Sequence, residues 1–556
     1  MSESHFEFWP ARLPSTLTLP ETSVPYNLEV SAHRYPEKMA IVYYGTGISY
    51  ARLHDEVKSL AGYLHEDLGV EGGDRVILYM QNSPQFVVAY YAILRANAVV
   101  VPVNPMHVTD ELGHYVEDSG AKVAIVGQEL YEQITPLSDR DGLEHVIGAT
   151  YSDYVEAETD LAVPDVVTAP REEREGAIFW GEALEAERSP KEVSTDAEDM
   201  ALLPYTSGTT GKPKGCIHTH RTLNANLIGA ALWNGIATDS VSLSTLPFFH
   251  VTGMEHSMNA PIFTGGAAVL MTRWDRKLAA ELVQRYRITH WTNISTMVVD
   301  FLSNPEIGVY DLSSFQFVGG GGAPLPEAVG EKLEELTGIR YAEGYGLSET
   351  IAQTHMNPPD RPKLQCLGMP SFDVDSRVVN PETLVEVGVG EEGEIVSSGP
   401  QVMKGYWNRP GADEEAFFER DGKRFLRTGD IGMRDEEGYF FMVDRLKRMI
   451  NVSGYNVWPA EVESALYEHP AIQEAVIIAV PDERSGEAAK AMVVLEEEEK
   501  GKVSEEEIVE WAKGRMAAYK YPRSVEFINE LPKSGSGKIL WRVLQEREQE
   551  KIAEAK

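Results

Sequence analysis

The sequence predicts an α/β protein with two parts. The large N-terminal region combines parallel sheets covered by helices with a small β-rich subdomain, and a smaller C-terminal α+β domain follows. Helical and β-rich segments alternate over residues 25–150 and resume over 200–400, the stretch 375–399 is β-rich, and the pattern changes near residue 445. Such alternation forms parallel sheets because each strand returns through a helix. A chain of 556 residues also exceeds what one hydrophobic core holds.

The N-terminal segments support this pattern one by one. Residues 50–68 have the apolar spacing of a helix, and FVVAYYAILRA predicts a second helix. Strands are predicted at RVILYM (75–80), AVVVPV (98–103), KVAIVG (122–127), AAVLMT (267–272) and FQFVGGGG (315–322). Residues 150–200 are acidic and contain Pro164 and Pro170, so we expect a surface excursion without chemistry.

The C-terminal segment has a different order of elements. It opens with DRLKRMINVSGYNVWPAEVE (444–463), and a helix is predicted at 459–468, strands at 475–480 and 490–496, and a helix at 504–517. This is an α+β unit of domain size. We therefore expect one domain over residues 1–445 and another over 446–556.

Composition and charge narrow the class of protein. The chain has 50 Lys and Arg against 87 Asp and Glu, and this formal net charge of -37 opposes nucleic-acid binding. Polyanionic small molecules would need local cations. The N-terminus lacks a basic segment before an apolar run, and Arg95 and Asn97 interrupt the longest apolar stretch, so we expect no signal peptide and no integral membrane segment. Cys216 and Cys366 suit no metal or disulfide spacing, which favours a reducing cytoplasm.

The most informative segment is YTSGTTGKPKG, residues 205–215. It holds three glycines, four Ser or Thr hydroxyls and two lysines in eleven residues. Glycines let backbone N–H groups approach an oxyanion, hydroxyls donate to it and lysines add positive charge, so the segment predicts a polyphosphate-binding loop. It is not a Walker A loop, because Pro213 stands where that loop has Ser or Thr after its Gly-Lys.

This loop resembles the signature loop of the adenylate-forming superfamily, which includes acyl-CoA synthetases, peptide-synthetase adenylation domains and beetle luciferases. Further motifs of that superfamily follow in order: FFHVTG (248–253), GYGLSET (344–350), RTGD (427–430), the hinge segment 444–463 and PKSGSGK (532–538). The resemblance covers about residues 25–545 and is strongest to AMP-forming fatty acyl-CoA synthetases. It implies that ATP and a carboxylic acid give acyl-AMP and pyrophosphate, and that coenzyme A then displaces AMP.

The resemblance implies a set of nucleotide contacts. Tyr345 would supply a flat face for adenine, Asp430 and Arg445 would contact the ribose, and Glu349 with Thr209 would hold Mg²⁺ against the phosphates. The expected ATP and AMP contacts are Thr206, Ser207, Gly208, Thr209, Thr210, Lys214, Gly321, Gly322, Ala323, Glu343, Gly344, Tyr345, Gly346, Ser348, Asp430 and Arg445.

The resemblance also implies catalytic and thiol-binding residues. Lys538 would bring the carboxylate and the α-phosphate together, and Lys447 would be the hinge about which a mobile C-terminal domain rotates between the two half-reactions. Arg448, Gly454 and Tyr455 would contact CoA. His250 has no second metal ligand beside it and would border the acyl pocket and the thiol channel; a packed core histidine is the alternative.

The acid is the least determined part of the prediction. The expected acyl-binding residues, Val251, Met254, Asn293, Met297, Gly320 and Leu347, are apolar or small and favour a medium- or long-chain fatty acid. Asn451, where many aryl-acid ligases have lysine, also favours an aliphatic acid.

Three alternatives stay open at this stage. They are an aryl or short-chain acid ligase, a stand-alone adenylating enzyme that loads a carrier protein, and an inactive nucleotide-binding protein. The presence of Lys538, Glu349, Asp430 and Arg445 argues against the inactive protein. The expected partners are small molecules and not nucleic acid, and a homodimer is left open.

Overall fold

The computed structural model describes residues 3–138, 142–174, 176–192, 194–206, 212–452, 455–482, 486–533 and 539–554. The chain divides into two compact units. The first unit comprises residues 1–376, 397–426 and 437–440, and the second comprises 377–396, 427–436 and 441–556. The second unit therefore includes parts of the chain that precede residue 445. The functional boundary at residue 445 stays a prediction.

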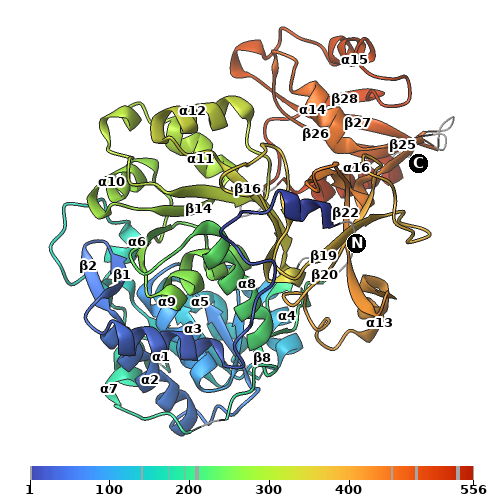
Figure 1. Cartoon of the computed structure of the whole chain (residues 1–556). Helices are drawn as coiled ribbons and strands as arrows, with labels where there is room; N and C mark the ends of the chain where they lie inside the picture. The colour runs from blue at the N-terminus through green and yellow to red at the C-terminus, as the bar shows by residue number, and fades with distance from the viewer. Residues whose placement is uncertain are drawn as a thin grey trace. The chain divides into compact units, whose positions relative to one another are not determined.

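A nine-stranded sheet forms the centre of the first unit (Figure 1). Its order is β18-β17-β16-β15-β14-β12-β13-β1-β2, with parallel pairing from β16 through to β1 and antiparallel pairing at both edges. The strands are β1 (Met39–Tyr43), β2 (Thr46–Ser49), β12 (Val241–Ser244), β13 (Ala267–Leu270), β14 (His290–Ile294), β15 (Phe317–Gly321), β16 (Ala342–Leu347), β17 (Ala352–Met356) and β18 (Met369–Pro370).

Helices cover both faces of this sheet, as predicted for an α/β protein. One face carries α10 (Arg276–Tyr286), α11 (Ser295–Leu302) and α12 (Glu327–Thr337), and the other carries α8 (His220–Asn234) and α9 (Ala260–Thr264) (Figure 1). Between β12 and α9 the chain forms a π-helix, η5 (Gly253–Asn259), whose residues are all buried. Wide turns of this kind are rare and are often found at functional sites.

A second sheet in the first unit has the order β11-β8-β4-β3-β5-β6-β7. Its strands are β3 (Arg75–Tyr79), β4 (Val99–Pro102), β5 (Val123–Gly127), β6 (His145–Ala149), β7 (Ile178–Phe179), β8 (Met200–Leu202) and β11 (His218–Thr219). Beside it lie α1 (Val24–Arg34), α2 (Tyr50–Glu66), α3 (Pro84–Arg95), α4 (Thr109–Ser119), α5 (Tyr131–Ile134), α6 (Asp165–Thr168), α7 (Trp180–Glu185) and the 3-10 turn η4 (Tyr151–Tyr154).

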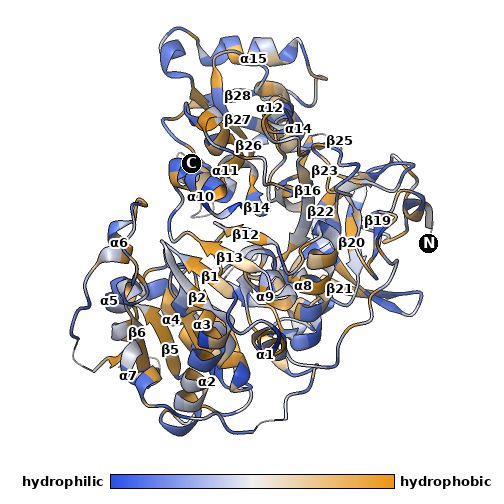
Figure 2. Cartoon of the chain, turned by 60° about the vertical axis from the view of Figure 1, so that its left-hand side comes forward, coloured by the Kyte–Doolittle hydropathy of each residue, from blue (hydrophilic) through white to orange (hydrophobic). Residues whose placement is uncertain are grey.

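Two features of this sheet refine the predictions. The apolar stretch around residue 90 contains α3, which is buried from Pro84 to Leu94 and begins at the cap residue Ser83, whose hydroxyl accepts from the Phe86 N–H. Strand β5 of this sheet is likewise apolar, as are β1 and β13 of the nine-stranded sheet (Figure 2). The acidic stretch 150–200 is more than the predicted surface excursion, because β7 within it pairs in parallel with β6.

The predicted β-rich subdomain is a five-stranded sheet of order β19-β20-β22-β21, with β23 paired to β22. Its strands are β19 (Asp375–Val379), β20 (Gly393–Ser398), β21 (Phe417–Arg420), β22 (Lys423–Arg434) and β23 (Phe440–Arg445), and α13 (Pro410–Ala416) precedes β21. The chain segments that form these strands are divided between the two units.

The C-terminal part of the second unit has the predicted α+β order. The strands are β24 (Ile450–Val452), β25 (Tyr455–Val457), β26 (Ile472–Asp482), β27 (Gly486–Leu495) and β28 (Ser524–Phe527), and the helices are α14 (Pro459–Leu466), α15 (Glu505–Lys513) and α16 (Trp541–Glu554). Strands β26 and β27 form a long antiparallel hairpin, and β28 adds in parallel to β27. Helix α15 ends before Gly514, four residues earlier than expected.

Within the part of the chain that the structure describes, no helix has both the length and the apolar character needed to cross a membrane. Cys216 and Cys366 are both buried.

Candidate active site

The carboxyl ends of β15 and β16 form a glycine-rich edge of the nine-stranded sheet. A Cβ placed on Gly320 would lie 1.8 Å from the carbonyl oxygen of Asn293 on β14, and one on Gly321 would lie 2.4 Å from the carbonyl oxygen of Gly344 on β16. Since real Cβ atoms essentially never approach other atoms within 3.0 Å, only glycine fits at either position. The spacing of the strands therefore requires these glycines, at the edge where open parallel sheets bind ligands.

The expected adenine contact, Tyr345, lies on β16 beside a buried histidine. Its ring centre is 5.5 Å from that of His355 on β17, and burial lowers the pKa of His355 to about 3, so this imidazole is neutral. Tyr345 itself is partly exposed, and Gly322 and Ala323 after β15 are exposed. These residues thus present a flat ring and open backbone at one edge.

Glu343 has a different environment from a ligand-binding carboxylate. Its Oε1 accepts from the Leu325 N–H at 2.8 Å, its Oε2 accepts from the Cys366 N–H at 2.9 Å, and its carbonyl oxygen accepts from Asn357. Burial raises the pKa of Glu343, and the backbone donors oppose that shift. The side chain therefore fixes the loops next to β16, and a nucleotide contact by Glu343 stays a prediction.

The expected metal ligand, Glu349, lies in the short turn η7 (Ser348–Thr350). The hydroxyl of Tyr406 donates to Glu349 Oε1 at 3.0 Å, and the Met403 N–H donates to the carbonyl oxygen of Glu349 at 2.8 Å. Two non-glycine residues with positive φ follow the turn, Ile351 at 51° and Ala352 at 119°. Backbone of this kind is costly for β-branched residues and tends to occur at functional sites.

A buried histidine, His218, contacts the backbone of this turn. His218 Nε2 lies 2.8 Å from the carbonyl oxygen of Ser348, and burial lowers the pKa of His218 to about 4. A neutral imidazole with its proton on Nε2 donates to that oxygen. Neither His218 nor Tyr406 was predicted from the sequence as a site residue.

The predicted phosphate loop is framed by a two-stranded hairpin, β9 (Tyr205–Thr206) and β10 (Lys214–Gly215), in which Thr206 pairs with Lys214. The predicted contacts Ser207, Gly208, Thr209 and Thr210 lie outside the described residues. The Lys214 ammonium lies 5.0 Å from the centre of the Tyr406 ring. One tyrosine therefore contacts both the predicted phosphate lysine and the predicted metal ligand.

The predicted acyl-binding residues lie on β14, β15 and α11 and in or just before η5, except for Leu347, which ends β16. Val251, Met254 and Asn293 are buried, and Met297 is partly buried against the same core. Leu347 instead packs against a separate cluster formed by Cys216, Met403 and Leu426. Its place in an acyl pocket stays a prediction.

His250 is exposed, so the alternative of a packed core histidine is wrong. The Nδ1 atom of the His250 ring accepts from the Thr252 backbone N–H at 3.3 Å. The backbone N–H of His250 donates to the carbonyl oxygen of Pro247. The polar group that is buried nearby is Glu255 in η5, which accepts from Asn259 Nδ2 at 2.7 Å and whose pKa burial raises. No sequence signal identified this carboxyl group.

In the second unit, the two predicted ribose contacts form an ion pair. Arg445 Nε lies 3.0 Å from Oδ1 of Asp430, a residue whose side chain is 1% exposed. The turn that carries Asp430 is held by Glu394, which pairs with Arg427 at 2.7 Å and accepts from the Gly429 N–H at 3.1 Å. Glu394 therefore holds the turn that carries Asp430, and none of the sequence motifs includes it.

Of the predicted CoA contacts, only the side chain of Arg448 lies within the described residues. Arg448 pairs with Glu463 and stacks on Trp541 with only 13% of its side chain exposed, so CoA would have to compete with this ion pair. The side chains of Lys447 and Tyr455, and all of Gly454 and Lys538, lie outside the described residues. Lys447 belongs to the 3-10 turn η8 (Leu446–Arg448).

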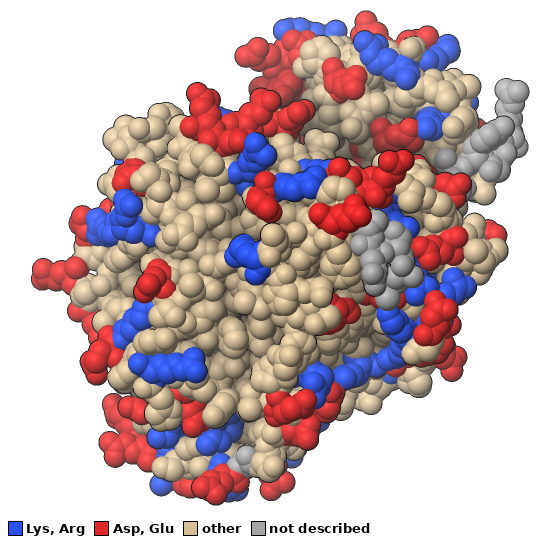
Figure 3. Space-filling view, viewed as in Figure 1, with Lys and Arg blue, Asp and Glu red and all other residues tan. Residues whose placement is uncertain are grey.

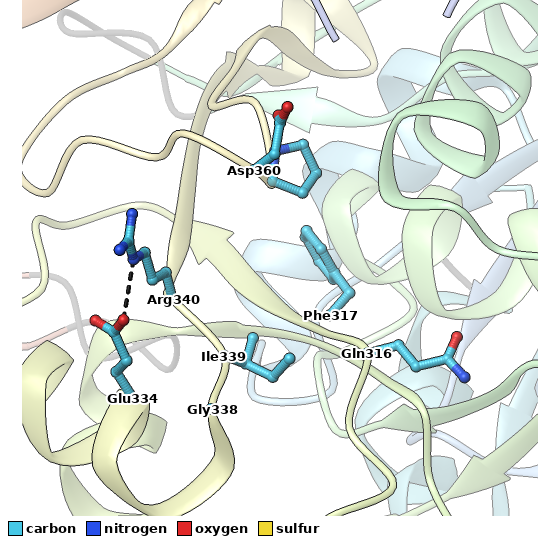
Figure 4. Close-up of a pocket in the computed structure, with 8 residues that line it drawn as sticks. Gln316, Phe317, Glu334, Gly338, Ile339, Arg340 and Asp360 are labelled. Atoms are coloured by element: carbon cyan, nitrogen blue, oxygen red, sulfur yellow. Dashed lines mark hydrogen bonds and ion pairs between the residues drawn. The ribbon is translucent and has the colours of Figure 1, made fainter. Parts of the chain in front are cut away.

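A surface pocket of about 300 Å³ in the first unit is not this site (Figure 4). It is lined by Gln316, Phe317, Glu334, Gly338, Ile339, Arg340, Pro359 and Asp360. These residues border the amino ends of β15 and β16, opposite the glycine-rich edge.

Two family models match the chain. One, described as AMP-binding enzyme, matches residues 28–407, and the other, described as AMP-binding enzyme C-terminal domain, matches residues 461–538. The chain belongs to the AMP-binding enzyme family. Among curated relatives, the long-chain-fatty-acid–CoA ligase of Bacillus subtilis (strain 168) is 37% identical over 555 residues, which is 98% of this chain and 97% of the relative.

Solved structures of AMP-binding enzymes have the same fold. ATP-bound MatB from Rhodopseudomonas palustris matches with a TM-score of 0.81 and 28% identity, covering 95% of this chain and 99% of that one. The anthranilate CoA ligase AuaEII in complex with anthranoyl-AMP matches with a TM-score of 0.82 and 26% identity, covering 97% and 99%. The predicted family, the α/β fold and the assignment to acid–CoA ligases are confirmed.

Charge on this AMP-binding enzyme is spread out. On the face in Figure 3, acidic side chains are distributed with basic ones between them. In the first unit, Lys214 supplies a cation near Tyr406 and Glu349 although the chain has a net charge of -37.

Proposed function

We propose that this AMP-binding enzyme joins a medium- or long-chain fatty acid to coenzyme A, with ATP as the adenylating substrate and Mg²⁺ as the metal. The observation that carries the proposal is the meeting of Lys214, Tyr406 and Glu349 beside the glycine-rich edge of β15 and β16. A cation, a carboxylate and open backbone are the groups that a metal–polyphosphate complex needs.

The residues at this edge fit Mg²⁺. Among the described residues, no group of three or more His, Cys, Asp or Glu side chains is arranged as a metal cage. Mg²⁺ suits such a site because it is usually held by one or two carboxylates, water and substrate phosphates. When bound, the metal ion would neutralise negative charge on the phosphates. Glu349 would hold it, with the Thr209 hydroxyl as the second predicted ligand.

The first half-reaction forms acyl-AMP. A carboxylate oxygen of the acid attacks the α-phosphorus of ATP, and pyrophosphate leaves with the electron pair of the broken bond. Lys214 would neutralise phosphate charge, Asp430 would accept hydrogen bonds from the ribose hydroxyls with Arg445 beside it, and Lys538 would bridge the carboxylate and the α-phosphate.

The second half-reaction transfers the acyl group. The sulfur of CoA attacks the acyl carbon, and AMP leaves with the former carboxylate oxygen. Rotation of the C-terminal domain about Lys447 would exchange Lys538 for residues that bind the thiol, among them Arg448, Gly454 and Tyr455. His250, which is exposed three residues before η5, would border the path of the thiol.

The choice of an apolar acid is supported by the buried and uncharged character of the predicted acyl-binding residues. Val251 and Met254 are buried, Met297 packs against the same large core, and none of the predicted acyl-binding residues is charged. The relative named a long-chain-fatty-acid–CoA ligase agrees with this choice. An aryl acid is the second candidate, because the structural neighbour AuaEII is an anthranilate CoA ligase. We place the enzyme in the cytoplasm and leave its oligomeric state open.

The test is a panel of acids assayed for AMP formation with and without CoA. Octanoate, palmitate, acetate and a cinnamate-type acid span the candidate substrates. The proposal expects CoA-dependent AMP formation with octanoate or palmitate. Strict preference for the cinnamate-type acid would replace the aliphatic substrate with an aryl acid, and failure to use free CoA would favour a carrier-protein acceptor.

A further inference from the structure

Tyr406 occupies a position in the first unit that the predicted mechanism does not use. Its hydroxyl donates to Glu349 Oε1 at 3.0 Å, and the Lys214 ammonium lies 5.0 Å from its ring centre. The Tyr406 N–H donates to Asp413 Oδ1 at 2.7 Å. The residue is therefore fixed at its backbone, its ring and its hydroxyl.

The backbone around Tyr406 is aligned with the strand that follows the phosphate loop. The Trp407 N–H donates to the Gly215 carbonyl at 2.8 Å, and the Ile217 N–H donates to the Gly405 carbonyl at 2.9 Å. An isolated antiparallel bridge joins Tyr406 to Cys216. This pairing places the Tyr406 ring next to β10 independently of any ligand.

We propose that Tyr406 is a positioning residue for the metal site, which orients the Glu349 carboxylate and at the same time seats Lys214. This inference rests on the proposed role of Glu349. A hydroxyl bound to Oε1 restricts rotation of the Glu349 carboxylate and so fixes the orientation in which the carboxylate would hold a cation. The ring face attracts the Lys214 ammonium, so the phosphate-binding cation and the metal ligand are held by a single side chain.

The first test is Tyr406→Phe, which removes the hydroxyl but keeps the ring beneath Lys214. Loss of a residue that orients a metal ligand typically weakens metal affinity about 10- to 100-fold. We expect the Mg²⁺ concentration for half-maximal ATP–pyrophosphate exchange to rise about 10-fold, with the maximal rate recovered at saturating Mg²⁺. A readout independent of activity is the Mg²⁺ midpoint for thermal stabilisation of the enzyme by ATP, which should shift by the same factor.

Tyr154→Phe is the matched control. The Tyr154 hydroxyl donates to Glu56 Oε2 at 2.6 Å, so this variant also deletes a Tyr–Glu hydrogen bond of the first unit, but between η4 and α2. It should lower the thermal midpoint and leave the Mg²⁺ dependence unchanged. An equal shift of the Mg²⁺ dependence in Tyr154→Phe and Tyr406→Phe would reduce Tyr406 to a structural residue and overturn the proposal.

Glu349→Gln separates this inference from the function on which it rests. If Glu349→Gln keeps the normal Mg²⁺ dependence, the metal assignment itself fails, and the role of Tyr406 fails with it. If Glu349→Gln raises the Mg²⁺ requirement while Tyr406→Phe does not, the metal assignment stands and only the positioning role is refuted. Raised requirements in both variants, with Tyr154→Phe unchanged, support the proposal.

Discussion

Replacement of Gly320 by alanine tests whether strand spacing dictates the glycine run. The added Cβ would lie 1.8 Å from the Asn293 carbonyl oxygen, whereas tolerated contacts begin near 3.0 Å, so β14 and β15 must separate by at least 1.2 Å. The two strands pair in parallel from His290 with Phe317 to Ile294 with Gly321, so separation would break ladder hydrogen bonds. Overpacking costs about 1–3 kcal/mol and each buried unpaired backbone group about 1–3 kcal/mol. If one ladder hydrogen bond breaks and leaves two backbone groups unpaired, we expect the free energy of unfolding to fall by about 3–9 kcal/mol.

The assay is chemical unfolding of the full chain, combined with ATP–pyrophosphate exchange. Gly411→Ala is the matched control, because Gly411 lies in α13 and a Cβ there would meet no atom within 4 Å. The free energy of unfolding of Gly411→Ala should equal that of the wild type or exceed it by about 0.5–1 kcal/mol. A Gly320→Ala variant with a normal unfolding midpoint and normal exchange would refute the argument that strand spacing requires glycine.

Two further predictions concern single side chains. Burial raises the pKa of Glu255 above its unfolded value near 4.5, so the stability that its protonated form contributes is complete below pH 4.5 and is lost as pH rises. The Glu255→Gln side chain cannot ionise, so the thermal midpoint of this variant, relative to that of the wild type, should rise between pH 5 and pH 8. A difference between the two midpoints that does not change with pH would contradict this. Lys538→Ala should nearly abolish acid-dependent pyrophosphate release but spare CoA attack on supplied acyl-adenylate; equal loss in both assays would refute its role.

The sequence predicted the fold because its strands and helices have strong local patterns. FQFVGGGG became β15, and the helix expected at residues 50–68 became α2, since apolar spacing and glycine punctuation act over a few residues. Helix ends were less accurate: α15 ends at Lys513 because Gly514 follows it. Strand β7 was missed because two residues at a sheet edge leave no periodic signal.

The site was predicted only as far as its motifs reached. The residues named from motifs include Glu349, Asp430 and Arg445, and the structure pairs the last two. Their supporting partners could not be found, because Tyr406 lies 57 positions from Glu349 and such pairs depend on tertiary packing. Likewise, nothing local distinguishes Glu343, whose oxygens bind backbone N–H groups, from a ligand-binding carboxylate.

The central claim is that an acid–CoA ligase reaction proceeds through acyl-AMP on this chain, and the fate of the carboxylate oxygen tests it most directly. The acid preferred in the panel is supplied with both carboxylate oxygens labelled with ¹⁸O, together with ATP, Mg²⁺ and CoA, and the products are analysed by mass spectrometry. Attack of the carboxylate on the α-phosphorus, followed by transfer to the thiol, predicts AMP that carries one ¹⁸O atom and acyl-CoA that retains the other. Unlabelled AMP, or release of ADP with labelled phosphate, would contradict the account.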